Sequence, residues 1–485
     1  MRLAGEVTGF HDAALRELLT EIGVDPALVD STITVVGDAP VLPSPLRAAE
    51  AGTLALAAQA ATMSLLGERR DGPSQDAWIA PRDATFVLNP FDYYRRNGKP
   101  SRLFDRFEAR PDRGSFLTDD GRQISFGALV RRNHDRLLAL LEAANTRQAI
   151  AEAVSSWKAD ELEEAAAEAA VPVAVLRSTA EWRDSEAGKL AASSRVGRVD
   201  LIAPADPVPL SPAARPLAGI RVLDMTHVVA GPTIGRGLAE YGADVLHVAT
   251  LNPDLQDELE VATQLSIGKR SAQIELDDPE DRLAFERLIE TADVFVQSWR
   301  PGMLERHGYP PERIAELNPG IVQLSVSCYG DIGPWGRRGG YDGLALASIG
   351  ARAAEAAWRA EKDRLAGGGS KQEGFRGLLT DTLTGILGSA VVASLLMRRA
   401  VEGGSFRADV TLAGVGMWLQ DLGAIGPEVP VTPTLGRPRL RRIHSCFGTL
   451  DYVAPAIRYS GLDPLLSRPP EPVGSSPPTW DGGLS

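Results

Sequence analysis

One carboxylate in this chain is placed where it could do chemistry. Asp381 lies near the start of "GLLTDTLTGILGSAVVASLLMRR" (377–399), a long run of mostly small or apolar residues that predicts a helix. Free N–H groups and the positive end of the helix dipole would keep such a carboxylate ionised, and therefore nucleophilic, and could stabilise an oxyanion. An ordinary helix cap, worth about 1 kcal/mol, gives the same local pattern, and the local sequence alone favours that interpretation.

Other motifs that commonly mark an active site are absent or incomplete. The stretch "VVAGPTIGRG" (228–237) is not G-x-G-x-x-G, and the next strand ends in "HVAT" without an acidic residue, which disfavours a dinucleotide. In "SIGKRS" (266–271) the serine does not directly follow the lysine and the upstream glycine of a phosphate loop is missing. The sequence holds no G-x-S-x-G, H-E-x-x-H or C-x-x-C, so a serine hydrolase or a metal site is not expected.

The bulk composition narrows the class of protein. A chain of 485 residues with 44% hydrophobic residues is expected to fold as two or three globular domains. Its net charge of −13 argues against a nucleic-acid partner, because phosphate neutralisation needs a basic excess. The N-terminus does not resemble a signal peptide, and the apolar run at 51–66 is shorter than the roughly 20 residues of a membrane span. We therefore expect a cytoplasmic protein with no membrane partner.

Elements that could position Asp381 follow the proline-rich segment 201–216, which predicts a linker or an extended crossing segment. Strand 219–226, helix 230–243 and strand 244–249 form a predicted right-handed βαβ unit. Further strands and helices alternate to about residue 425, which predicts a doubly wound, mostly parallel α/β domain. Such sheets bind ligands at the carboxyl ends of their strands, where the Asp381 helix is also expected to begin.

A weak internal repeat is present. Residues 51–84 can be laid over residues 381–414: both give a small-residue helix, then "SLL", arginines, a glycine turn and a short strand. In this register Ala51 takes the place of Asp381, and Glu50 is the nearest carboxylate. The N-terminal part is therefore predicted to be a degenerate partial copy that lacks the carboxylate.

Six blocks over residues 216–425 resemble the class III coenzyme A transferases, the formyl-CoA and carnitine-CoA transferase family of CaiB/BaiF type. These blocks are "PLAGIRVLDMTHVVAGPTIGRGLAEYGADVLHV", "GKRSAQIELDDPEDR", "DVFVQSWRPGMLERHG", "NPGIVQLSVSCYGDIGPW", "GGYD" and "TDTLTGILGSAVVASLLMRR". The resemblance implies an enzyme that moves coenzyme A from an acyl-CoA to a carboxylic acid through an aspartyl anhydride and an aspartyl-CoA thioester. It also implies a homodimer that needs no metal.

The resemblance divides the chain into four predicted parts. A degenerate helical copy of part of the large domain occupies 1–90, and a small α+β return domain with the linker occupies 91–212. The large domain spans 213–425, and a tail spans 426–485. Whether one chain folds its halves onto each other or interlocks with a partner chain stays open.

The resemblance also assigns site residues. Asp381 takes the position of the nucleophile. The remaining positions are expected to contact coenzyme A or line the thioester pocket: Val228 and Val229 at the pantetheine, Lys269 and Arg306 at the phosphates, Trp299 at the adenine, and Tyr341 with Asp342 at the thioester. Each of these positions also has a purely structural explanation. The two basic residues could be surface charges and the valines could pack within a loop. The tryptophan could be a core residue, and Tyr341 with Asp342 could form a turn.

Departures from the family pattern leave other functions open. Ala249 and Thr250 end a strand after which the family usually has a basic residue, so one phosphate contact is expected to be lost. The family's glycine-rich loop has no match, since "AGGGSK" (366–371) lies too close to Asp381. An α-methylacyl-CoA racemase would need a histidine near Tyr341, and a non-catalytic CoA-binding protein would not need to retain Asp381.

Overall fold

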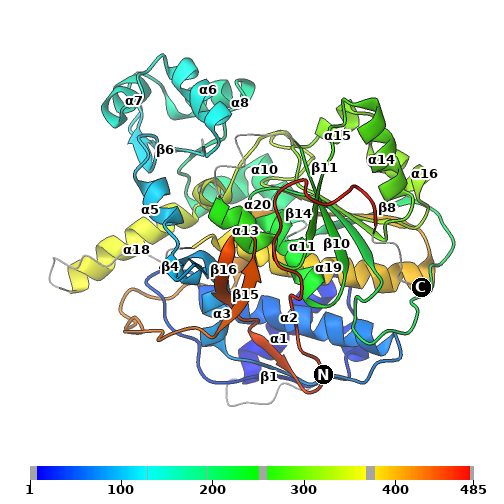
Figure 1. Ribbon diagram of the computed structural model, residues 1–485. Helices are drawn as coiled ribbons and strands as arrows, with labels where there is room; N and C mark the ends of the chain where they lie inside the picture. Colours follow the sequence, from blue (N-terminus) through cyan, green and yellow to red (C-terminus); the bar gives the residue numbers. More distant parts are fainter. Residues whose placement is uncertain (1–7, 128, 194, 251–258, 367–376, 481–485) are drawn as a thin grey trace.

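A seven-stranded sheet forms the centre of the protein in the computed structural model, which describes residues 8–480 except 128, 194, 251–258 and 367–376 (Figure 1). The strand order is β11-β10-β9-β12-β13-β14-β8, and β8 alone runs antiparallel to its neighbour. The strands are β8 (Arg198–Ala203), β9 (Arg221–Met225), β10 (Asp244–Ala249), β11 (Arg270–Gln273), β12 (Val294–Gln297), β13 (Val322–Ser327) and β14 (Ser405–Thr411). The predicted mostly parallel sheet is present, and the first residues of the proline-rich segment belong to β8.

Helices cover both faces of this sheet. Alternate strand residues point to opposite faces, so Val222 joins one hydrophobic cluster and Leu223 joins another. The first face packs on α11 (Ala230–Glu240) and α19 (Leu379–Glu402). The second packs on α14 (Pro279–Ile289), α15 (Met303–Arg306) and α16 (Pro311–Leu317). The strand order reverses between β9 and β12, which is the arrangement of a doubly wound sheet.

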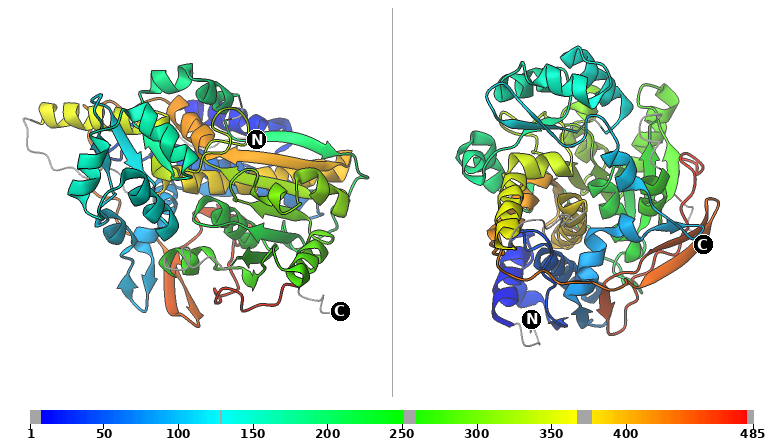
Figure 2. Two further views of the ribbon diagram at one scale, coloured as in Figure 1. Left: turned by 90° about the horizontal axis from the view of Figure 1, so that it is seen from above. Right: turned by 90° about the vertical axis from the view of Figure 1, so that its left-hand side faces the viewer.

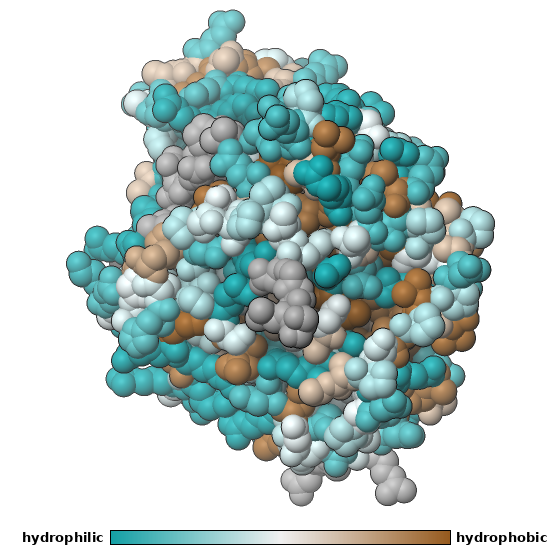
Figure 3. Space-filling view, turned by 45° about the vertical axis from the view of Figure 1, so that its right-hand side comes forward, coloured by the Kyte–Doolittle hydropathy of each residue, from teal (hydrophilic) through white to brown (hydrophobic). Residues whose placement is uncertain are grey.

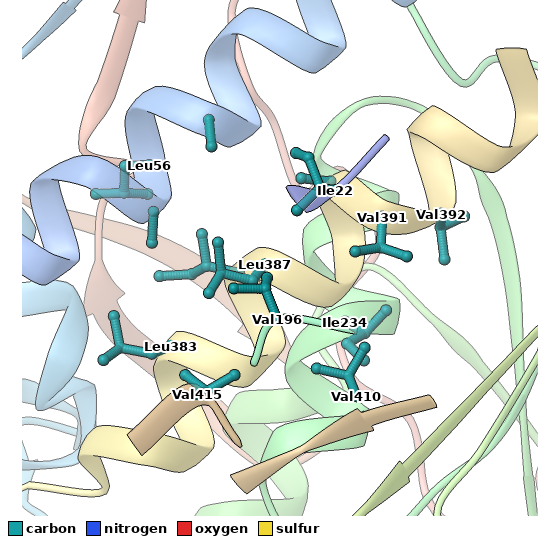
Figure 4. Packing of buried hydrophobic residues seen from close by; sticks show 14 of the residues in the cluster. Ile22, Leu56, Val196, Ile234, Leu383, Leu387, Val391, Val392, Val410 and Val415 are labelled. Atoms are coloured by element: carbon teal, nitrogen blue, oxygen red, sulfur yellow. The ribbon is translucent and has the colours of Figure 1, made fainter. Parts of the chain in front are cut away.

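Helix α19 lies at the centre of the first cluster, where Leu383, Leu387 and Val391 pack against Ile234 of α11 and Val410 of β14 (Figure 4). Its small residues permit close approach, since a Cβ at Gly388 would collide with Ile234. Among the described residues α19 is the one helix with the length and hydropathy of a membrane span, and its whole apolar window is buried in the protein.

A second long helix, α2 (Ala48–Glu68), packs beside α19 and is also buried on nearly all sides. It connects β1 (Ile33–Val35) to β2 (Ala77–Ile79), and α3 (Pro81–Leu88) follows. Strand β1 pairs with β2 in parallel, and β17 (Ile457–Tyr459) pairs with β2 antiparallel on the other side. The N-terminal region therefore shares a small sheet with the C-terminal tail. Helix α1 (Thr8–Glu21) and the 3₁₀ helix η1 (Pro26–Leu28) precede this sheet.

A small domain projects from this body at the upper left of Figure 1. Its sheet contains β5 (Ser115–Leu117), β6 (Gln123–Phe126) and β7 (Val173–Val175), and α6 (Arg131–Leu141), α7 (Arg147–Val154) and α8 (Ala159–Glu168) complete its own core. The views in Figure 2 place this domain beside α18 (Ala351–Leu365). Helices α9 (Thr179–Asp184) and α10 (Glu186–Ala192) lead from it to β8.

The remaining elements are a further small sheet and several short helices. Strands β15 (Leu440–Ser445), β16 (Gly448–Val453), β3 (Arg95–Arg96) and β4 (Lys99–Pro100) form a further antiparallel sheet. The short helices are α4 (Pro90–Tyr93), α5 (Leu103–Glu108), α13 (Leu259–Leu265), α17 (Asp342–Ser348) and α20 (Leu412–Asp421). The surface seen in Figure 3 is mostly hydrophilic, and its hydrophobic residues are scattered in small groups.

Candidate active site

A cavity of about 1060 Å³ lies at the carboxyl ends of β9 and β10. The loops after these strands form one side of it, and α18, the start of α19 and the small domain form the others. This volume is at the upper end of the range for small-molecule sites. Seven of the eight predicted site residues line it: Val228, Val229, Lys269, Trp299, Tyr341, Asp342 and Asp381.

Asp381 is in the first turn of α19 but does not cap the helix. The N-cap position is Leu378, and its side chain makes no capping hydrogen bond. A carboxylate from another helix does this instead: Asp342 Oδ1 accepts from Thr380 N at 2.6 Å, from Thr380 Oγ1 at 2.7 Å and from Asp381 N at 3.4 Å. The simple cap interpretation of Asp381 is therefore wrong, because Asp342 performs that task.

The pKa of Asp381 is shifted in the direction opposite to that expected for a carboxylate at a helix N-terminus. Its side chain is 5% exposed, and burial together with the neighbouring Asp342 raises its pKa well above the ordinary value. Burial raises the pKa of Asp342 as well, but Thr380 and Arg352 oppose that shift. Asp342 has the hydrogen bonds that favour a charge and Asp381 has none of them, so we assign the negative charge to Asp342 and a proton to Asp381. The helix N–H groups that were expected to ionise Asp381 are used by its neighbour.

The loop after β9 carries backbone strain. Val228 has φ of 68°, a left-handed conformation that is rare for a β-branched residue. Ser298 holds this loop, since its Oγ accepts from His227 N at 2.9 Å, and Val229 O accepts from Thr233 N in the first turn of α11. Both valines are thereby held at the cavity wall.

Lys269 forms a buried ion pair. Its Nζ lies 2.7 Å from Asp224 Oδ2 and 2.7 Å from Pro232 O, and its side chain is 2% exposed. A Cβ at Gly235 would collide with the Asp224 carboxylate, so this glycine leaves room for the pair. The arrangement ties β9 to the start of α11. Contact of Lys269 with a phosphate stays a prediction.

Arg306 lies away from the cavity. It is exposed at the end of α15, and its Nη1 is 3.9 Å from Met303 Sδ. Its predicted phosphate contact is untested. Trp299 lies in the cavity wall, with its ring packed edge-to-face on His307 at 5.8 Å between centroids.

Tyr341 joins the site to the small domain. Asn133 Nδ2 of α6 donates to Tyr341 OH at 3.4 Å, and Gly127 packs closely on Leu344, two residues after Asp342. The small domain thus covers the start of α17 and adds Phe126, Leu129 and Val130 to the cavity wall.

Several polar residues of the cavity were not predicted from the sequence: Arg113, His227, His247 and Arg352. His227 is in a quoted block, yet no spacing marked it, and burial lowers its pKa to about 4, so it is neutral. Arg113 belongs to the small domain, which carries none of the six blocks. Residues 367–371 of "AGGGSK" lie outside the described residues. Within the part of the chain that the structure describes, no group of three or more His, Cys, Asp or Glu is arranged to hold a metal ion.

Comparisons with known proteins relate part of this chain to CoA-transferases. Residues 217–433 match the model of CoA-transferase family III. The chain is 34% identical over 271 residues to an acetyl-coenzyme A transferase of Hypoxylon pulicicidum, which is 50% of this chain and 42% of that protein. It is 36% identical over 145 residues to a formyl-CoA:oxalate CoA-transferase of Rhodopseudomonas palustris, which is 28% of this chain and 34% of that protein.

A solved structure is also similar. The crystal structure of a hypothetical protein from Mycobacterium tuberculosis shares 30% identity, with a TM-score of 0.36 and coverage of 43% of this chain and 58% of that one. The chain matches less than half of the length of each of the two curated transferases. The family match covers six of the seven strands of the large sheet (all but β8), the strained loop and Asp381, so this region of the chain is similar to CoA-transferase family III.

Proposed function

We propose that this protein transfers coenzyme A from an acyl-CoA to a carboxylic acid, with Asp381 as nucleophile. One observation carries the proposal: a carboxyl group without an ion pair among the described residues lies in the wall of a large cavity, within the segment that matches CoA-transferase family III. The cavity receives both substrates in turn.

The reaction is a series of exchanges at one carboxylate. An oxygen of ionised Asp381 attacks the thioester carbonyl, the C–S bond breaks, and an acyl-aspartyl anhydride and the CoA thiolate form. The thiolate then attacks the aspartyl carbonyl, which releases the first acid as its carboxylate and leaves an aspartyl-CoA thioester. The acceptor carboxylate attacks this thioester, the thiolate leaves, and its return to the acyl carbonyl gives the new acyl-CoA and regenerates Asp381.

The neighbouring carboxylate makes ionisation of the nucleophile the costly step. Asp342 holds the negative charge of the pair, so Asp381 must lose its proton beside it before attack. The rate of anhydride formation is therefore expected to rise with pH through the raised pKa of Asp381.

Trapping the intermediate tests the proposal. Incubation with an acyl-CoA and hydroxylamine should leave a hydroxamate on Asp381, which peptide mass spectrometry would locate. Asp381→Asn keeps the shape of the side chain and should lower CoA exchange by at least about 10³-fold. A racemase or a non-catalytic CoA-binding protein would show no adduct, and full exchange by the Asp381→Asn variant would remove Asp381 from the mechanism.

We also propose that residues 1–90 are a partial copy of the large domain folded onto that domain. The N-terminal sheet repeats one edge of the large sheet: β1 and β2 are parallel with β17 antiparallel, as β13 and β14 are parallel with β8 antiparallel. Gln59 Nε2 donates to Ser389 Oγ at 2.7 Å, and these two positions are equivalent when 51–84 is laid over 381–414. Contact between equivalent residues is what a two-fold axis produces.

This arrangement bears on the predicted homodimer. If the copy replaces a second large domain, one chain forms the shared interface by itself, and light scattering should give the monomer mass of 51.7 kDa. A mass twice as large would favour the homodimer that the family resemblance implies. The cytoplasmic location is likewise a prediction.

A further inference from the structure

The end of the described chain, residues 466–480, lies along the free edge of the large sheet (red in Figure 1). Ser476 N donates to Ser271 O of the edge strand β11 at 2.8 Å. Both ends of the segment are anchored, since Leu466 is buried in the first hydrophobic cluster and Trp480 packs against the second. We call this segment the tail strap. Its middle residues line the cavity that contains Asp381: Glu471, Pro472 and Val473.

Glu471 is held in the cavity wall by two hydrogen bonds. Its Oε1 accepts from Ser271 N at 2.5 Å and from Ser476 Oγ at 2.5 Å. Pro470 and Pro472 flank it, and the proline that follows favours an extended backbone at Glu471. Both hydrogen bonds use Oε1. The other oxygen, Oε2, makes none with the residues that the structure describes, so it can accept from a molecule in the cavity.

Glu471 and the nucleophile lie over different parts of the large sheet. A Cβ at Gly388 of α19 would meet Ile234 of α11 and Leu324 of β13, so α19 packs over the middle of the sheet. Glu471 is bonded to β11, which is four places from β13 in the strand order. Neighbouring strands are about 4.8 Å apart, which puts the Glu471 and Asp381 side chains on the order of 15 Å from each other.

A pantetheine arm can span this separation. Together with its diphosphate it has the length of about five amino-acid residues, on the order of 17 Å when extended. The loops after β9 and β10 line the cavity between the two ends, with Val228, Val229, Ala249 and Thr250. A thioester that reacts at Asp381 and extends past these loops would bring the ribose of its nucleotide to Glu471.

A carboxylate at this place favours a hydroxyl group and disfavours a phosphate. In dinucleotide-binding sheets an acidic side chain accepts from a ribose hydroxyl, whereas an arginine in the same region accommodates a ribose phosphate. The two basic residues that begin β11 and precede it have other partners: Lys269 pairs with Asp224, and Arg270 donates to Thr479 O at 2.8 Å. Coenzyme A carries a phosphate on the 3′ position of its ribose, and Glu471 would repel it.

We propose that Glu471 accepts from a ribose hydroxyl of the thioester's nucleotide and disfavours a 3′-phosphate, so that the protein prefers thioesters of 3′-dephospho-coenzyme A to those of coenzyme A. This inference rests on the proposed transfer at Asp381, and it names the carrier that is transferred. Coenzyme A and 3′-dephospho-coenzyme A make a matched pair of probes, because they differ by this one phosphate.

Calorimetric titration with the two free thiols tests the proposal. The wild-type protein should bind 3′-dephospho-coenzyme A at least about threefold more tightly than coenzyme A. Glu471→Gln keeps an oxygen for Ser271 N and removes the charge. It should tighten coenzyme A binding about 3- to 10-fold and change binding of the dephospho form less than about twofold. Asp463→Asn is the charge control and should change neither affinity, because Asp463 precedes the tail strap, is 71% exposed and pairs with Arg441.

A second variant leaves the hydrogen bonds of Glu471 in place. Val473 lines the cavity and is 42% exposed, so Val473→Lys adds a cation beside Glu471 and should reverse the preference toward coenzyme A. Thermal unfolding of each variant separates a folding defect from a change in binding.

Three results would overturn the inference. They are coenzyme A binding as tightly as the dephospho form or more tightly in the wild type, unchanged or equally weakened binding of both in Glu471→Gln, and no binding of either up to 10 mM. Failure of the proposed function would be separate, since it would show as absence of a hydroxylamine-labile adduct on Asp381 in the wild type with either thioester.

Discussion

Helices α2 and α19 lie side by side in the core, but their first turns use a carboxylate differently. At the start of α2, Glu50 forms an ion pair with Arg47 at 3.0 Å, and Ala51 is fully buried. At the start of α19, Asp381 is buried beside a second carboxylate and forms no ion pair with any residue that the structure describes. Both helices are buried on nearly all sides, so the fold requires two apolar helices at these places. The carboxyl group of Asp381 has no counterpart at Ala51 of α2, and buried groups with a shifted pKa cluster at functional sites.

Placing a carboxylate at the equivalent position of α2 should have the largest effect on stability. Ala51→Asp would bury a carboxyl group at a site with 0% exposure, which we expect to cost about 3–4 kcal/mol of unfolding free energy. Chemical denaturation of the variant measures the loss. Ala51→Ser, which adds a hydroxyl without a charge, is the control and should cost about 1 kcal/mol. An Ala51→Asp protein as stable as the wild type would show that α2 also begins at a polar cavity.

Changing Asp342 should separate its role as the cap of α19 from its effect on the pKa of Asp381. Asp342→Asn keeps an oxygen that can accept from Thr380 N and Oγ1 but removes the like charge that raises the pKa of Asp381. The nucleophile would then ionise at lower pH, and the acidic limb of the kcat/KM profile should move down by roughly one pH unit. An unshifted limb would mean that burial alone sets the pKa of Asp381.

Sequence periodicity predicted the parts of this fold that depend on local pattern. The βαβ unit, the doubly wound order and the position of Asp381 at the start of a buried helix all follow from hydrophobic spacing, which the sheet and α19 preserve. Pairings between distant residues could not be predicted in this way. Asp342 caps α19 from 39 positions upstream, and Asp224 pairs with Lys269 from 45 positions upstream. No motif marks such contacts, so neither the protonation state of Asp381 nor the ion pair of Lys269 could be predicted.

The pairing of β17 with β2 was missed for the same reason. The tail returns across more than 300 residues to complete the N-terminal sheet, and each of its strands is too short for periodicity to show its partner. The proposed repeat, by contrast, could be recognised in the sequence because each of its two segments is continuous.

Removing the ionisable group of Asp381 should raise stability at high pH while it removes activity. In the unfolded chain an aspartate ionises near 3.9, whereas burial and Asp342 raise the pKa in the folded protein. Between these two values the folded state binds the proton more strongly, so the wild type loses stability as pH rises. Asp381→Asn should therefore unfold about 1–3 °C higher than the wild type near pH 8. The difference should vanish near pH 4, and a pH-independent difference would contradict the raised pKa.

The smallest expected effect concerns the contact that joins the two helices. Ser389 Oγ accepts from Gln59 Nε2 at 2.7 Å and donates to Ile386 O at 2.7 Å, so the hydroxyl is fully used in a buried position. Gln59→Leu and Ser389→Ala should each cost about 1 kcal/mol, because each leaves a buried polar group without its partner. The double variant should cost less than the sum, with a coupling energy of about 0.5–1 kcal/mol in a denaturation cycle. Additive losses would mean that the helices are held by apolar packing alone, and equivalence of the two positions would then rest on strand topology. A measurable coupling would show that α2 and α19 are also joined by a polar contact at the positions that the proposed repeat makes equivalent.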